Sequence, residues 1–87
     1  MRKIIFSPTS IEELNEYKFG NQKLVFKIFE LIEDIQRTPF NGLGKPEPLK
    51  EDFSGYWSRR INDEHRLIYK ITNDFIEIIK CRDHYNT

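Results

Sequence analysis

The chain has 87 residues, of which 38% are hydrophobic and 14% aromatic, so it can build one modest core but not two. Fourteen basic and fourteen acidic side chains cancel to a formal charge of zero, which excludes the overall positive field that many nucleic-acid-binding proteins carry. The sequence holds no apolar run of membrane-spanning length, and its one cysteine, Cys81, cannot form an internal disulfide. We therefore expect a single domain over residues 1–87, located in the cytoplasm and not bound to a membrane.

The first half of the chain predicts one strand followed by two helices. Residues 2–7 are β-prone, and Ser7 and Pro8 then favour the start of a helix that ends near Gly20. The next helix, over residues 22–37, has the strongest periodicity of the chain, and a Thr-Pro pair ends it. Its apolar face consists of Leu24, Val25, Ile28, Leu31, Ile32 and Ile35.

The second half predicts three strands, over residues 56–61, 65–71 and 75–82. Asn and Asp residues separate them, which is typical of the tight turns of an antiparallel meander. Apolar residues on both faces of the last strand favour an interior position in the sheet. The element order is β-α-α-β-β-β, so we predict an α+β fold whose antiparallel sheet carries the two N-terminal helices on one face.

A restrained carboxylate lies in the loop before these strands. Glu47 stands between Pro46 and Pro48, and each proline limits its own backbone and that of the residue before it. Long loops in small domains are usually functional or disordered, and the aromatic and charged composition of this one favours function. The alternative is a solvated surface carboxylate, with Lys45 and Lys50 as its companions.

Arginines follow on the predicted strands. Arg60 is the better candidate for an exposed site, because its neighbour Arg59 shares a strand face with Trp57 and Ile61 and fits there only at the margin of the core. Arg66 lies on the next strand. Each arginine, taken alone, is also explained by a solvated or cross-strand-paired charge.

The last residues add a histidine and a tyrosine, His84 and Tyr85, for which a frayed terminus is the alternative explanation. The sequence has no zinc-ligand spacing, no phosphate-binding loop and no nucleophilic-serine motif. A carboxylate, arginines and a histidine, with no metal or cofactor, are the minimum for cleaving RNA through its own 2′-hydroxyl. A base takes the 2′-OH proton, cations stabilise the phosphorane, and an acid protonates the leaving 5′-oxygen.

Several long motifs resemble the YoeB-type toxins of the RelE/ParE superfamily, and they follow one another over essentially the whole chain. They are Arg37-Thr38-Pro39-Phe40, Gly42-x-Gly44-Lys45-Pro46-Glu47-Pro48-Leu49-Lys50, Ser54-Gly55-Tyr56-Trp57-Ser58-Arg59-Arg60-Ile61, Glu64-His65-Arg66-Leu67-Ile68-Tyr69 and Cys81-Arg82-x-His84-Tyr85. The resemblance implies a RelE-like fold and the toxin of a type II toxin–antitoxin system. It implies a ribosome-dependent mRNA interferase, an endoribonuclease that cuts mRNA in the ribosomal A site and so inhibits translation. The implied partners are a YefM-type antitoxin, the ribosome and mRNA, and the oligomeric state stays open, with a homodimer as one candidate.

The resemblance also implies roles for single residues. Glu47 would be the general base and His84 the general acid. Arg66 would stabilise the phosphate in the transition state, and Tyr85 would orient the substrate or His84.

A phosphate-binding surface formed by Lys50, Arg60 and Arg59 would complete this site, without a metal or another cofactor. Two functions of other classes remain open. A ParE-like, non-catalytic topoisomerase inhibitor would share the fold but would not need an acid–base pair. A small interaction module would instead dock a partner peptide on the aromatic loop over residues 53–57.

Overall fold

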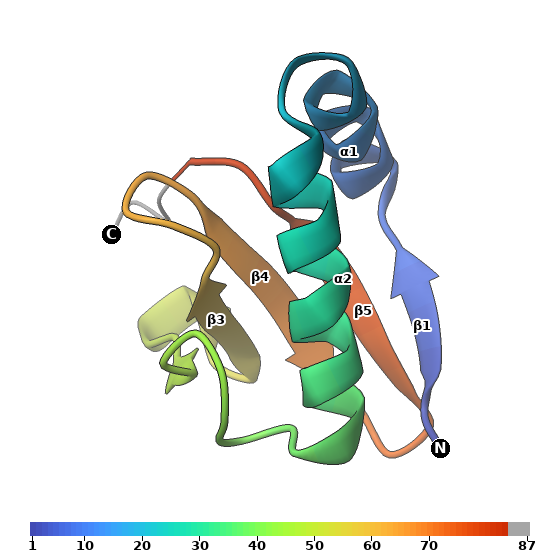
Figure 1. Ribbon diagram of the computed structural model, residues 1–87. Coiled ribbons are helices and arrows are strands. Elements are labelled where there is room, and N and C mark those ends of the chain that lie inside the picture. Colours follow the sequence, from blue (N-terminus) through green and yellow to red (C-terminus); the bar gives the residue numbers. More distant parts are fainter. Residues whose placement is uncertain (84–87) are drawn as a thin grey trace.

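The computed structural model describes residues 1–83, and in this part of the chain two helices cover one face of a five-stranded sheet (Figure 1). In chain order the elements are β1 Lys3–Phe6, α1 Pro8–Gly20, α2 Gln22–Arg37, β2 Glu47–Pro48, the 3-10 turn η1 Glu51–Phe53, β3 Tyr56–Arg60, β4 Arg66–Ile71 and β5 Phe75–Lys80. The strands lie in the order β1-β5-β4-β3-β2. The predicted α+β class is confirmed, as are the two helices and the interior position of the last strand. No helix in residues 1–83 is both long and apolar enough to cross a membrane.

The sheet is mixed, whereas we predicted a purely antiparallel one. β1 pairs with β5 in parallel, because these two strands are joined through the helices and the rest of the chain rather than by a hairpin. β2 was not predicted as a strand. It pairs antiparallel with β3 at the edge of the sheet, where a proline without an N–H is tolerated. The predicted antiparallel meander of β3, β4 and β5 is confirmed.

The core lies between α2 and the sheet. The apolar stripe of α2 is buried as its periodicity predicts: Ile28, Leu31 and Ile35 have no exposed surface. From the sheet side, Leu67 and Ile76 meet them in the same cluster. In Figure 1, α2 crosses the face of the sheet, and α1 lies near the upper end of α2.

A buried ion pair joins this core to the loop that follows α2. Arg59 of β3 is completely buried, and its Nη1 donates to Oδ2 of Asp34 on α2 at 2.6 Å. Its Nε donates to the hydroxyl of Tyr69 at 3.1 Å. The backbone N–H of Leu43 donates to the same Asp34 oxygen at 2.9 Å, and this bond, with those from Arg59 and Arg37, lowers the pKa of Asp34 against the opposing effect of burial.

The same guanidinium fixes the course of residues 38–43. Its Nη2 donates to the carbonyl oxygens of Thr38 and Asn41 at 2.6 and 2.9 Å, and Nη1 also donates to that of Leu43 at 3.1 Å. Gly42 passes so close to Asp34 that an added Cβ would collide with the carboxylate. One buried side chain therefore satisfies three carbonyl groups of a loop that has no regular secondary structure of its own.

We expect Arg59→Met to lower the free energy of unfolding by about 3–5 kcal/mol, because it removes the buried cation that pairs with Asp34 and leaves three carbonyl groups without their donor. Arg60→Gln on the same strand is the matched control, since this exposed side chain should change stability by no more than about 0.5 kcal/mol. Urea denaturation followed by circular dichroism measures both. Equal stabilities for the two variants would contradict this role of Arg59.

The thiol of Cys81, at the end of β5, provides a second test of the packing. Burial, and then the neighbouring Glu13 carboxylate, raise the pKa of Cys81 from its ordinary value of 9.0 to about 12. We expect iodoacetamide to label the thiol at about pH 8 only after unfolding. The free energy of unfolding should also fall as the pH rises above 9.0 towards 12, since over this range only the unfolded chain loses the proton. Labelling of native protein as fast as in urea would show that the thiol is accessible.

Candidate active site on the open face of the sheet

Side chains alternate between the two faces of the sheet. Trp57 and Arg59 of β3, like Leu67 and Tyr69 of β4, point towards the core under the helices. The residues between them point to the other side, which we call the open face. On β3, β4 and β5 its members are Tyr56, Ser58, Arg60, Arg66, Ile68, Lys70, Phe75, Glu77 and Lys80.

Glu47 joins the open face through the short strand β2. Its Cα pairs with that of Ser58, and its side chain is exposed. The loop reaches this position through Gly44, which has a φ of 78° and whose carbonyl accepts a hydrogen bond from the Arg60 N–H at 2.6 Å. A Cβ at this glycine would lie 2.9 Å from the Arg60 carbonyl oxygen and 3.1 Å from Leu31, so the close approach requires glycine.

Two arginines face each other next to this carboxylate. The Cα atoms of Arg60 and Arg66 are partners across β3 and β4. Glu47 pairs with Ser58, two residues before Arg60, so it is a diagonal neighbour of Arg60 at roughly 7–8 Å. Nη1 of Arg66 donates to the carbonyl oxygens of Asn62 and His65 at 2.8 and 3.1 Å, which holds the guanidinium against the β3–β4 turn. Like charges directly opposite each other are unfavourable in a sheet, and an anion bound between them would relieve this repulsion.

One lysine, Lys80, adds positive charge to the open face, and Lys50 follows β2 along the chain. Lys50 is exposed and directly precedes η1. Lys80 pairs with Ile68 in the same row as Ser58 and Glu47. The sequence did not reveal Lys80, because a bulge between β4 and β5 shifts the alternation of the last strand there.

Arg59 does not belong to this surface, and our prediction that it binds phosphate is wrong. It has no exposed surface, and Nε, Nη1 and Nη2 all donate to protein acceptors. The physical reason is the alternation of β3, which turns Arg60 to the open face and its neighbour into the core.

The other two predicted catalytic residues, His84 and Tyr85, lie outside the described residues. The described chain reaches Asp83, whose carbonyl oxygen accepts a hydrogen bond from the backbone N–H of Arg66 at 3.1 Å. The chain is therefore next to the start of β4, and to the backbone of Arg66, immediately before His84.

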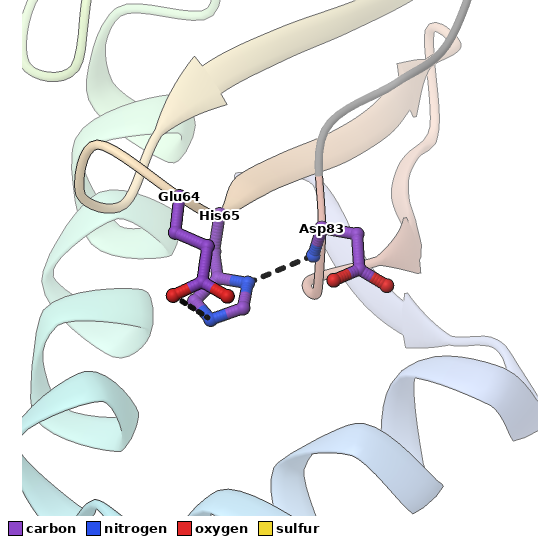
Figure 2. A group of neighbouring side chains, drawn as sticks. All are labelled: Glu64, His65 and Asp83. Atoms are coloured by element: carbon purple, nitrogen blue, oxygen red, sulfur yellow. Dashed lines mark hydrogen bonds and ion pairs between the residues drawn. The ribbon is translucent and has the colours of Figure 1, made fainter.

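The described residues contain one group with the donor atoms for a metal ion, formed by Glu64, His65 and Asp83 (Figure 2). Its ligand atoms lie within 4.8 Å of one another. However, Nδ1 of His65 already accepts a hydrogen bond from the Asp83 N–H at 2.8 Å, and Nε2 lies 3.6 Å from the Glu64 carboxylate. The group is thus explained by contacts within the protein, and we assign no ion to it.

Comparison with known proteins gives the family. A family model described as the YoeB-like toxin of bacterial type II toxin–antitoxin systems matches residues 6–85. Toxin YoeB of Escherichia coli K12 is 51% identical over 83 residues, which are 95% of this chain and 99% of that protein. Toxin RelK of Mycobacterium tuberculosis is 47% identical over 98% of this chain and 100% of its own length.

Solved structures agree with this match. The YoeB/ParE toxin from Agrobacterium tumefaciens superposes with a TM-score of 0.92 at 45% identity, covering 95% of this chain and 99% of that one. The toxin in the YoeB–YefM complex from Staphylococcus aureus gives a TM-score of 0.87 at 44% identity, covering 98% and 99% of the two chains. The chain therefore belongs to the YoeB-like toxins of bacterial type II toxin–antitoxin systems.

Proposed function

We propose that this toxin is a ribosome-dependent mRNA interferase, an endoribonuclease that cuts mRNA in the ribosomal A site and so stops translation. The observation that supports this most is the position of Glu47, which pairs with Ser58 and is a diagonal neighbour of Arg60, itself the cross-strand partner of Arg66. A carboxylate that can take a proton and two guanidinium groups that can hold a phosphate suit cleavage through the 2′-hydroxyl.

In this proposal the reaction is a metal-independent transfer of the phosphate. Glu47 takes the proton of the 2′-OH, whose oxygen attacks the adjacent phosphorus to form a 2′,3′-cyclic phosphate. Arg66 stabilises the negative charge of the phosphorane. His84 gives a proton to the leaving 5′-oxygen, a role that suits a side chain whose ordinary pKa lies near neutral pH. Tyr85 orients the substrate or His84.

Lys50 and Arg60 bind the flanking phosphates, and Lys80 extends this surface on the open face. A protein with a formal charge of zero depends on such local clusters to attract RNA. The ribosome supplies the remaining positioning of the mRNA. Binding weakens as salt rises, because the contacts to phosphate displace counterions.

The partners follow from the relatives. The Staphylococcus aureus toxins were solved as a YoeB dimer and as YoeB–YefM complexes, one of them a heterotetramer. We accordingly propose a YefM-type antitoxin that binds this toxin and blocks it, and a homodimer as an assembly of the free toxin. A ribosomal substrate and a bacterial antitoxin both require a cytoplasmic location.

The test is cleavage of mRNA on purified translating ribosomes, mapped by primer extension. We expect cuts within the codon in the A site for the wild type and a rate lower by about 10²–10⁴-fold for Glu47→Gln, which keeps the shape of the side chain but cannot act as the base. Glu33→Gln is the matched control, because it removes an exposed carboxylate on α2, away from the open face.

Folded, antitoxin-free wild type that leaves ribosome-bound mRNA intact would contradict the nuclease. Full activity of Glu47→Gln would instead remove Glu47 from the mechanism.

A further inference from the structure

His65 makes an unusual contact for a residue at the end of a hairpin. It directly precedes β4 and is only 9% exposed. Its Nδ1 accepts a hydrogen bond from the backbone N–H of Asp83 at 2.8 Å, although the two residues are 18 positions apart in the sequence (Figure 2). Because Nδ1 acts as the acceptor, the proton of the neutral imidazole is on Nε2, on the side of the Glu64 carboxylate.

The residue held by this bond has a strained backbone. Asp83 has a φ of 63°, in the left-handed region that residues other than glycine seldom adopt. Its N–H is bound by His65 and its carbonyl oxygen by the N–H of Arg66, at 3.1 Å. Such conformations persist where the surroundings fix them, and they concentrate at functional sites. Two successive residues of one hairpin thus clamp both polar groups of Asp83.

The imidazole is itself held in place. The ring of Tyr17 meets it edge-on, with the centroids 5.5 Å apart, and the Tyr17 hydroxyl donates to the carbonyl oxygen of Cys81 at 2.8 Å. The backbone N–H of His65 donates to Oδ1 of Asn62 at 2.7 Å. Tyr17 of α1 thus contacts both His65 and Cys81. Helix α1 therefore holds the imidazole of His65 and the chain just before Asp83 in place together.

We propose that His65 is a positioning residue for RNA cleavage, which it supports by fixing the backbone of Asp83, the residue directly before His84 in the sequence. The inference rests on the proposed function, in which His84 is the acid. The imidazole acts through the acceptor at Nδ1 and takes no part in the chemistry. Adjacent Cα atoms are only about 3.8 Å apart, so rotation of the Asp83 backbone displaces the residue after it. Displacement of a reacting group by about 1 Å costs on the order of 100-fold in rate.

The test compares two substitutions of His65. His65→Phe keeps an aromatic ring against Tyr17 but has no acceptor, whereas the side-chain oxygen of His65→Asn can accept the Asp83 N–H in place of Nδ1. Hydrogen exchange of the Asp83 amide, measured by NMR, reports the bond. Cleavage on ribosomes gives kcat and KM, and urea denaturation gives the stability of each variant.

For His65→Phe we expect the Asp83 amide to exchange at least about 10-fold faster and kcat to fall by about 10–100-fold, with KM within about twofold because the arginines of the open face are unchanged. His65→Asn should keep both the protection and kcat within about threefold of the wild type. His65→Gln provides a second variant without a correctly placed acceptor, should His65→Phe fail to fold.

Each outcome decides a different point. Normal kcat in a variant whose Asp83 amide has lost its protection would overturn the positioning role. Equal loss of kcat in the Asn and Phe variants, following their stabilities, would reduce His65 to a structural residue and likewise overturn it. Wild type with a protected Asp83 amide but no cleavage of ribosome-bound mRNA would overturn the nuclease itself, and with it any role of His65 in the reaction.

Discussion

The ion pair between Arg59 and Asp34 is the constraint on which the candidate site depends. It joins β3 to α2 inside the core, and the same guanidinium satisfies three carbonyl groups of residues 38–43. A buried charge without a partner is costly, so the loop cannot leave this position without losing much of the stability of the domain. The loop then passes Gly44 and delivers Glu47 to the edge of the sheet beside Ser58.

A second network fixes the other end of the site. Tyr17 binds the carbonyl of Cys81, and the buried carboxylate of Glu13 accepts the Cys81 N–H at 2.6 Å, so α1 holds the chain as it leaves β5. His65 then binds Asp83. The open face thus lies between two segments without regular structure, the loop before β2 and the chain after β5, and each is tied down by buried polar groups. Glu47 and the backbone of Asp83 are thus each held in place from the core side, next to the strands that carry Arg60 and Arg66.

The sequence predicted the parts of this molecule that depend on local patterns. The periodicity of residues 22–37 was sufficient to predict α2, and the turn residues between the last strands were sufficient to predict the meander. The parallel pairing of β1 and the edge strand β2 were missed, because partners distant in sequence determine them. The alternation of β3 correctly predicted that Arg59 points to the same side as core residues. Only the structure shows that its charge pairs with Asp34, 25 positions away in the sequence. The contact between His65 and Asp83 was missed as well, since nothing local in the sequence marks the two residues as partners.

In the proposed reaction the open face cleaves RNA through the 2′-hydroxyl of the substrate, so an mRNA that lacks this hydroxyl at the cut site tests the reaction. Ribosomes are programmed with an mRNA whose A-site codon carries a 2′-deoxy sugar at the nucleotide that the toxin cuts, beside the all-ribose mRNA. We expect the toxin to bind the ribosomes that carry the deoxy mRNA but to leave this mRNA intact. These ribosomes should therefore inhibit cleavage of the all-ribose mRNA by competing for the toxin. Cleavage of the deoxy mRNA at the same position would contradict the proposed reaction, because the attacking oxygen would then come from water.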